Sequence, residues 1–485
     1  MPSPFFPFRR PPGSLRMPRA PLSALALALA AAMPLVQASE IPDNDVLARI
    51  AALEQRLGIA PGEAVEGANL DQRLRIIERK LELQDEAVQA KAASAPVLAA
   101  SDKGVAIKSA DGSVELKLRA LVQADGRFFS GHVSQSDGFL LRRVEPTLEG
   151  TWGKLVAFRI NPQFAGDSAT LNDAYIDLRF DPRATLRIGK AKPPFGLERL
   201  QSSAATAQVE LGLPSELAPG RDLGVQLQGD LLGGALNYGI GAFNGAVDGR
   251  DAASANPDGE FEYVGRLFWE PFRTAAGHFG TLGLGVAASV GDTHGSGNNV
   301  LPRYRTPGQE QWFGYGSNVA ADGQRLRKTV QGYWYRGPFG LLGEWIGSAQ
   351  DVRVTSGTGA GTRATLDNRA WQIAAGWVLT GEDTGFRGVQ QPSSPFAIGQ
   401  DGWGALELTA RYGRLAIDED AFPLFASASA SARSARSWGL ALNWYLNRNL
   451  KLVANYAGTV FDGGAAASGD RPEERIFFTR AQLAF

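Results

Sequence analysis

A period of two in hydrophobicity runs almost without interruption from about residue 105 to the end of this 485-residue chain. Within 438–444, for example, Trp and Leu alternate with Gly, Ala and Asn. Residues two apart share one face of a β-strand, so the pattern predicts strands with one apolar face. The segments are ~9–13 residues long, whereas strands of a soluble sandwich average ~5–6. Their second face is polar or merely small, which fits strands that separate lipid from water.

Sixteen alternating segments can be counted along the chain. They cover roughly residues 114–129, 139–150, 153–164, 172–181, 185–192, 222–231, 235–244, 260–271, 279–292, 324–336, 339–350, 368–381, 402–415, 435–446, 449–462 and 473–485. In lipid every backbone N–H and C=O must be paired, and a closed barrel leaves no strand edge unpaired. We therefore predict an all-β fold, a 16-stranded antiparallel transmembrane β-barrel over residues 105–485, preceded by a short N-terminal periplasmic helical or coiled-coil segment.

The connections between the segments alternate in length. Short ones lie at 151–152, 181–184, 232–234 and 447–448, and long ones at 193–221, 293–323, 351–367 and 416–434. Short turns on one side and long loops on the other are typical of outer-membrane barrels. The stretch 382–401 is long where a short turn is due. An even number of strands returns both barrel ends to the same side, which we expect to be periplasmic.

Residues 1–38 have the features of a secretory signal peptide. Arginines precede an apolar core at 22–36, and Val36-Gln37-Ala38 fits a small-residue cleavage site. Either Met1 or Met17 could be the true start. The chain is therefore expected to be exported.

Residues 39–104 favour helix and end in a linker. Leu70, Leu74, Ile77 and Leu81 recur at the a/d spacing of a coiled coil, and a similar run precedes the break at Pro61-Gly62. Each run lasts only about two heptads. Two alternatives remain open, a small self-associating stalk and an amphipathic helix that lies on another surface. The Ala- and Ser-rich stretch 92–101 is expected to be a linker.

The composition argues against several kinds of chemistry. Without Cys there can be no disulfide, thiolate metal site or Cys nucleophile, and the three His lie in polar or Gly-rich stretches. No G-x-S-x-G elbow occurs either. We expect neither enzymatic activity nor a catalytic residue, metal or cofactor, and no nucleic-acid partner. A structural tether that grips the cell wall through residues 39–104 is a further alternative.

Four segments carry a resemblance to a known family. They are Arg187 to Leu200 (RIGKAKPPFGLERL), Pro219 to Val225 (PGRDLGV), Leu379 to Glu382 followed by Gly402 to Leu408 (LTGE and GWGALEL), and Asn443 to Asn449 (NWYLNRN). With these segments the chain resembles the phosphate-selective porins O and P over about residues 105–485. The resemblance implies a trimer of 16-stranded barrels in the bacterial outer membrane, in contact with its lipid and lipopolysaccharide. It also implies a third long loop folded into the pore, and basic residues that guide inorganic phosphate or related small anions.

Basic residues predicted to face the pore are the candidate solute contacts. Phosphate favours the planar fork of Arg, with Lys as a point charge. From strand parity and the third loop we select Arg143, Arg159, Lys190, Lys192, Arg199 and Arg221, with Glu198 and Glu210 opposing them. Arg142 adjoins Arg143, and only one of the two can face inward unless a bulge intervenes.

The alternative for each of these cations is a salt bridge in the wall of a hydrated lumen. The whole chain has 49 Lys and Arg against 50 Asp and Glu, so its net charge does not favour anions. Only placement can produce selectivity, with acids held in pairs away from the constriction. A general porin without phosphate selectivity is therefore the second functional hypothesis.

Overall fold

The computed structural model describes residues 43–57, 59, 70–130, 135–166, 168–273 and 280–485. The chain divides into two compact units, the first ending at Ala93 and the second beginning at Ser94. The expected signal peptide and the expected helix break at Pro61-Gly62 lie outside the described residues.

Two helices make up the described part of the first unit. They are α1 (Asp43–Arg56) and α2 (Leu70–Ser94). Ile50, Ile59 and Ile77 form a small buried cluster between them, and Arg73 Nε donates to Glu54 Oε1 at 2.9 Å. Leu74 and Leu81 of the predicted a/d stripe stay exposed. Among the described helices of the chain, none combines the length and apolarity needed to cross a membrane.

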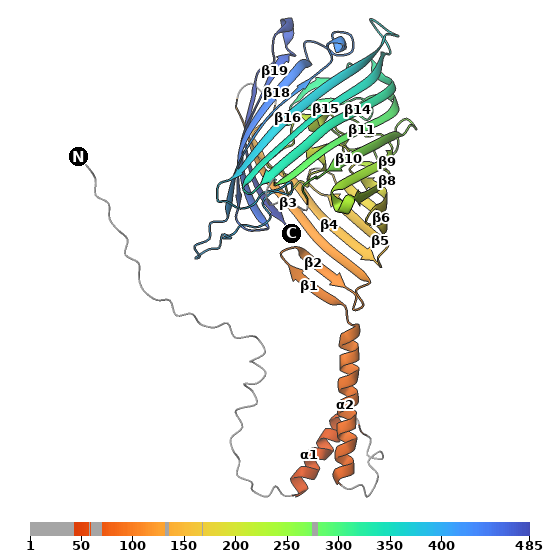
Figure 1. Cartoon of the computed structure of the whole chain (residues 1–485), viewed down its shortest axis with the longest axis vertical. Helices are drawn as coiled ribbons and strands as arrows, with labels where there is room; N and C mark the ends of the chain where they lie inside the picture. The colour runs from red at the N-terminus through yellow and green to blue at the C-terminus, as the bar shows by residue number, and fades with distance from the viewer. Residues whose placement is uncertain (1–42, 58, 60–69, 131–134, 167, 274–279) are drawn as a thin grey trace, which may run out of the picture. The chain divides into compact units, whose positions relative to one another are not determined.

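Sixteen antiparallel strands close into the barrel of the second unit (Figure 1). They are β3 (Val114–Ser130), β4 (Gly138–Trp152), β5 (Val156–Gln163), β6 (Thr170–Asp181), β7 (Ala184–Ala191), β8 (Asp222–Leu231), β9 (Leu236–Phe243), β10 (Glu262–Trp269), β11 (Thr281–Ser296), β14 (Val319–Arg336), β15 (Phe339–Val354), β16 (Arg363–Val378), β17 (Ala405–Ala416), β18 (Ala432–Tyr445), β19 (Leu450–Gly463) and β20 (Glu474–Ala484). The circle closes where β20 pairs with β3. The predicted fold class is confirmed, and each of the sixteen predicted segments overlaps one strand.

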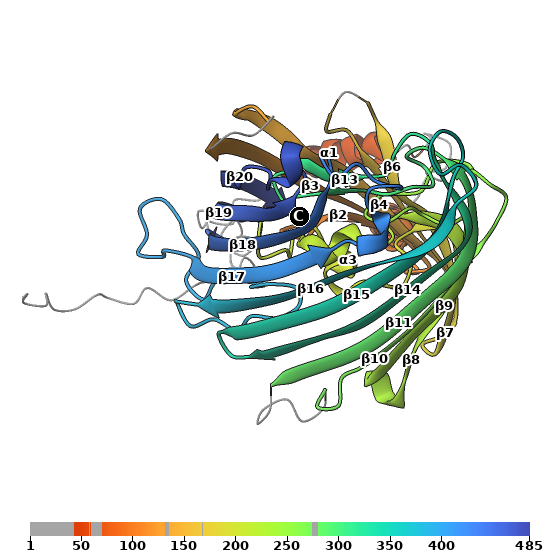
Figure 2. The same cartoon turned by 90° about the horizontal axis from the view of Figure 1, so that it is seen from above.

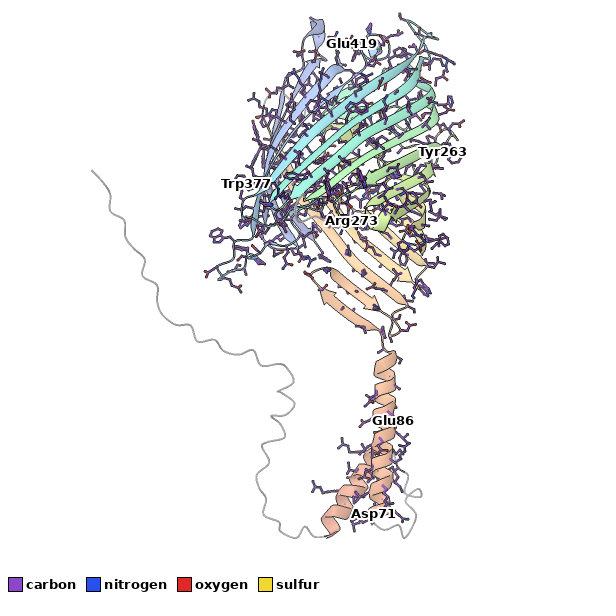
Figure 3. All side chains as sticks on the ribbon, in the orientation of Figure 1. Asp71, Glu86, Tyr263, Arg273, Trp377 and Glu419 are labelled. Carbon is purple, nitrogen blue, oxygen red and sulfur yellow. The ribbon has the colours of Figure 1, made fainter. Side chains whose placement is uncertain are left out.

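The outer surface of the barrel carries the apolar half of the alternation. On β18 the Trp and Leu residues of 438–444 share this face, and Leu440 is 52% exposed. Trp377 and Tyr263, labelled in Figure 3, are exposed aromatic residues of the same outer surface. The inner face carries the polar and small residues, as the alternation predicts.

A hairpin precedes the barrel strands where the sequence indicates a linker. It consists of β1 (Val97–Ser101) and β2 (Gly104–Lys108). β2 pairs with Glu115 to Leu118 near the start of β3, whereas β20 pairs with the later residues of β3, from Leu121 onward. Asn449 Nδ2 holds the hairpin turn by donating to Asp102 O at 2.6 Å. Its Ala-rich strands are too short for the alternation to stand out from the linker.

The connections follow the predicted alternation. Two residues, Gly337 and Pro338, join β14 to β15, and Gly337 takes the positive φ of 54° that so tight a turn needs. The connection 379–404 is long at this short-turn end of the barrel, as expected. Within this connection, Phe386 O accepts a hydrogen bond of 2.7 Å from Gln201 Nε2, which belongs to the segment between β7 and β8. The connection therefore folds into this end of the barrel.

An apolar core fills part of the barrel interior. The connection between β11 and β14 contains a small hairpin that no alternation in the sequence predicts, β12 (Arg303–Arg305) and β13 (Gln311–Gly314). Tyr304, Trp312 and Phe313 of this hairpin are fully buried and cluster with Ile346 and Leu366 of the inner wall. A cavity of about 760 Å³ remains along the inner faces of β3 to β8. This open space therefore lies toward one side of the barrel interior.

Candidate functional site

Loop 3, the connection 192–221 between β7 and β8, turns into the barrel instead of away from it. Pro193 and Pro194, which lack an N–H and cannot continue a strand ladder, follow β7 directly. Loop 3 then forms the short helix α3 (Leu197–Leu200) and the 3-10 turn η2 (Leu213–Glu216). Seen from above, α3 lies inside the ring of strands (Figure 2). The third long loop thus folds inward, as the resemblance implies.

Wall side chains bind the backbone of loop 3. Gln123 Nε2 donates to Ser203 O at 3.1 Å, and Lys451 Nζ donates to Thr206 O at 3.1 Å. Asn443 Nδ2 donates to Ala207 O at 2.9 Å. These bonds come from β3, β19 and β18, so the loop crosses the lumen from β7 to the far wall. The bonds satisfy carbonyls that irregular backbone would otherwise leave unpaired.

Two buried carboxylates anchor α3 to β15–β17. The Glu344 carboxylate accepts hydrogen bonds from the backbone N–H groups of Leu197 and Glu198. The Glu198 carboxylate in turn accepts from Gln372 Nε2 at 2.9 Å and Arg411 Nη1 at 2.9 Å. Glu198, predicted to oppose the pore cations, is therefore occupied in holding the loop against the wall.

A β-bulge turns two consecutive arginines toward the lumen. Gln123 of β3 lies opposite Arg143, and the next residue, Ala124, lies opposite Leu141, so Arg142 is the extra residue of β4. Arg143 Nη1 donates to Gln123 Oε1 at 2.7 Å, while Arg142 reaches loop 3. Alternation alone cannot place both side chains on one face, and the bulge resolves that conflict.

Glu210 of loop 3 is bound by two of these wall arginines. Its carboxylate lies 2.6 Å from Arg142 Nε and 2.7 Å from Arg127 Nη2. Burial opposes ionisation of Glu210, yet the Arg142 and Arg127 guanidiniums hold its pKa well below the ordinary value. The second acid predicted to oppose the pore cations is thus also paired.

Lys192 and Arg199 have no carboxylate partner among the described residues. Lys192 Nζ donates to Gln201 O at 2.9 Å and Arg199 Nη2 to Ser215 O at 2.6 Å. Within the described residues, neither cation forms a salt bridge. Burial lowers the pKa of Arg199, and burial together with Arg221 lowers the pKa of Lys192 to about 7. Arg199 Nε is buried with no hydrogen-bond partner in the described part of the chain.

Four of the six predicted solute contacts converge on one narrow pocket of about 50 Å³. They are Arg143, Lys192, Arg199 and Arg221. Arg221 Nε lies 2.8 Å from Asp173 Oδ1, and the pocket also contains Glu210 and Asp251. Because Glu210 is already bound by arginines outside this set, cations exceed the carboxylates available to balance them here.

Arg159 lines the wider cavity of about 760 Å³ below this pocket. Its Nη1 lies 2.8 Å from Glu149 Oε1, in a wall ion pair. Arg187 lines the same cavity, bonded to Asp177 at 2.8 Å with its guanidinium 3.8 Å from the centre of the Tyr175 ring. The cavity wall therefore mixes both signs of charge.

Lys190 is not brought together with the other five residues. It lies within β7, directly opposite Ala174 and Leu223, on the face that carries the exposed Ile188. Arg187, one position below Ile188, is on the lumen face. Lys190 and Lys192 are two residues apart in one motif and have the same strand parity, so the sequence does not reveal that the strand ends between them.

The narrow pocket, called the constriction below, also depends on residues that were not among the six candidates. The bulge lets Arg142 bind Glu210, which lines the pocket, and Glu344 and Gln372 hold α3 from strands far away in the sequence. The adjacent Arg142-Arg143 pair was a visible sign of a bulge. Strand alternation places Glu344 on the inner face, but no local pattern marks Glu344 or Gln372 as a partner of α3.

Comparisons with known proteins agree with the barrel fold. A family model described as phosphate-selective porin O and P matches residues 114–485. The chain is 23% identical over 411 residues to Porin O of Pseudomonas aeruginosa, a match that covers 79% of this chain and 91% of that protein. The crystal structure of the outer membrane channel DcaP of Acinetobacter baumannii is similar with a TM-score of 0.51 at 12% identity, covering 78% of this chain and 99% of that one.

Proposed function

Because this chain belongs to the family of phosphate-selective porins O and P, whose model spans its entire barrel, we propose that its outer-membrane channel selects small anions, with inorganic phosphate and related oxyanions as the solutes. The chain is a bacterial outer-membrane porin, and its barrel and inward loop are those of a channel. The proposal concerns what the channel passes.

The observation that carries the proposal is the unequal pairing of charges at the constriction. Glu198 and Glu210 are bound to Arg411 and to Arg142 with Arg127, whereas Lys192 and Arg199 face the pocket with only carbonyl partners. Two charges ~4 Å apart interact by about 1 kcal/mol in bulk water and by several times more near protein. An anion at this pocket therefore gains energy that a cation does not.

The kinds of donor present suit an oxyanion. A guanidinium presents a planar fork that can donate two bonds to two oxygens, and Lys adds a point charge. Arg143, Arg199 and Arg221 approach the pocket from β4, from α3 and from the start of β8, so their donors converge from different sides. A tetrahedral phosphate offers oxygens in several directions, which chloride does not.

One feature favours the second hypothesis, a general porin. Arg159, Arg187 and Arg221 are each bonded to a wall carboxylate at 2.8 Å. Such pairs hydrate a lumen without selecting a sign. If they dominated, permeation would follow solute size alone.

We further propose that the barrel assembles as a trimer through β7–β10. Strands β7, β9 and β10 have eight residues each. At ~3.3 Å per residue and a tilt of ~45° they rise ~19 Å, less than the ~25 Å apolar band of an outer-membrane barrel. An apolar groove lined by Val225, Ile240 and Tyr263 lies on the outer side of this low wall. A neighbouring barrel would cover both the short strands and the apolar groove. Crosslinking of the purified protein should then stop at three copies.

The proposed selectivity is tested with chloride current through single channels in planar bilayers. Phosphate added at millimolar concentration should reduce that current, and Lys192→Gln together with Arg199→Gln should weaken the block. Sulfate and a neutral sugar of similar size serve as comparison solutes. Equal block of the wild type and the double variant, or no block at all, would leave only the general porin.

A further inference from the structure

The outward face of β17 and β18 changes chemistry in a fixed order along the barrel. From the short-turn end, the directly opposed outward pairs are Leu406–Trp444, Leu408–Leu442, Ala410–Leu440, Tyr412–Trp438 and Arg414–Arg436. Aliphatic pairs suit the hydrocarbon of the bilayer, and Trp with Tyr suit its interface with water. The Arg414–Arg436 pair therefore lies one step beyond the interface, at the level of the lipid headgroups on the long-loop side.

The aromatic level continues on the neighbouring strands. The ring centroids of Trp371 on β16 and Tyr412 are 5.7 Å apart, and those of Trp438 and Tyr456 on β19 are 5.5 Å apart. Four consecutive strands thus carry interfacial rings at one height. This continuous belt fixes the depth of the two arginines independently of the β17–β18 register.

Arg414 and Arg436 are close to each other, and neither has an acidic partner among the described residues. Directly opposed residues of an antiparallel pair have Cβ atoms ~4.5–5.5 Å apart, where like charges destabilise the sheet. Arg414 Nη2 makes one long hydrogen bond, 3.4 Å to Ser434 Oγ. The Arg436 guanidinium makes no hydrogen bond or ion pair with any residue in the described ranges. The exposed Asp462 opposite Ser434 forms no ion pair with either arginine in those ranges.

Two other exposed arginines at this end of the barrel are paired. Arg369 lies 2.7 Å from Asp367, and Arg475 lies 2.8 Å from Glu473. The Arg414–Arg436 pair differs from these two arginines, because neither of its positive charges forms an ion pair with a carboxylate among the described residues.

We propose that Arg414 and Arg436 together bind a phosphate group on the headgroup of an anionic glycolipid in the outer leaflet, such as lipopolysaccharide. Two guanidiniums at this separation can share one phosphate, and the bound anion removes their mutual repulsion. The acyl chains of the same lipid would lie over Leu440 and Leu408. The site is on the outside of the barrel and is independent of the solute that the pore selects.

The test is binding of diphosphoryl lipid A to the detergent-solubilised protein, measured with EDTA present so that divalent cations cannot bridge. The double variant Arg414→Gln/Arg436→Gln should bind at least about tenfold more weakly than the wild type, a difference of ~1.4 kcal/mol. Lipid A without its phosphates should bind the wild type as weakly as the diphosphoryl lipid binds the double variant. Free inorganic phosphate should not compete at concentrations that saturate the pore, since a small anion lacks the acyl contacts.

Arg475→Gln is the matched control, because its charge is already balanced by Glu473 and its loss should change binding less than twofold. Arg436→Glu is a second test variant, because it places a carboxylate directly opposite Arg414 and so creates an ion pair. The barrel should keep its heat resistance, whereas lipid binding should be lost. Unchanged binding by either the double variant or Arg436→Glu would overturn the proposal. So would an equal loss in Arg475→Gln, or equal binding of lipid A with and without phosphates.

Discussion

The Glu210 carboxylate lies 2.6 Å from Nε of Arg142, an arginine that faces the lumen only because of a bulge in β4. This contact decides the electrostatics of the constriction. Without it, Glu210 would be free to neutralise Lys192 or Arg199 across the pocket that they line. With it, the loop acid and a wall base cancel each other, and the remaining cations stay available for a solute.

Replacing Glu210 by Gln should make the channel more selective for anions. The change removes the one negative charge that Arg142 and Arg127 share, so the net positive charge at the constriction rises by one unit. At ~4 Å each charge contributes about 1 kcal/mol or more, which corresponds to a several-fold rise in the ratio of chloride to potassium permeability. The reversal potential in a salt gradient measures this ratio.

Glu149→Gln is the comparison for that experiment. Glu149 pairs with Arg159 and Arg119 in the wider cavity, where water and salt screen charge more strongly. Its shift in reversal potential should be smaller than that of Glu210→Gln. An equal or larger shift would contradict the pairing described for loop 3.

The anion preference of the wild type should fall as pH rises through about 7. Burial depresses the pKa of Lys192 to about 7, so this side chain carries its charge below that pH and loses it above. Chloride is the suitable permeant anion, because phosphate itself titrates nearby. Lys192→Arg should keep the preference constant between about pH 6 and about pH 8, since Arg stays charged. A wild-type profile as flat as that of the variant would refute the titration.

Lys190 and Lys192 should differ although only one residue separates them. Lys192 lies in the constriction pocket, and Lys190 lies on the face of β7 that carries Ile188. Lys192→Gln should reduce chloride preference several-fold, whereas Lys190→Gln should leave it within error of the wild type. Single-channel recordings of the two variants under one salt gradient decide this, and a comparable loss in both would show that the strand register is wrong.

Gly212→Ala should loosen loop 3. An added Cβ would lie 1.7 Å from Gln372 Oε1, so Gln372 must move and its bond to Glu198 is lost. The loop should then sit less firmly against β16, giving noisier single-channel current and weaker selectivity. Gly385→Ala is the control, since no atom lies within 4 Å of its added Cβ. Identical, quiet recordings from both variants would mean that this contact does not hold the loop.

Most of the barrel could be predicted because the alternation within each strand shows by itself which side chains share the outer face and which share the inner face. The alternation in 438–444 places β18 without reference to any other strand, and the same holds for the other fifteen. The small hairpin of β12 and β13 could not be predicted in this way. Its Tyr304 and Trp312 are buried inside the barrel by contacts with distant loops, which no local period records.

The candidate site was predictable in composition but not in pairing. Arg143, Lys192, Arg199 and Arg221 meet because loop 3 folds inward, which the family resemblance implied. The partner of Glu210 depends on a bulge one residue wide, and a shift of one residue reverses the face of every side chain beyond it.

The reversal potential of single channels in asymmetric potassium chloride distinguishes an anion-selective pore from a general one. We expect the wild type to show the sign of a chloride-selective pore, and the triple variant Arg143→Gln/Lys192→Gln/Arg199→Gln to lose that preference. A cation-selective wild type, or a triple variant that matches the wild type, would contradict the account.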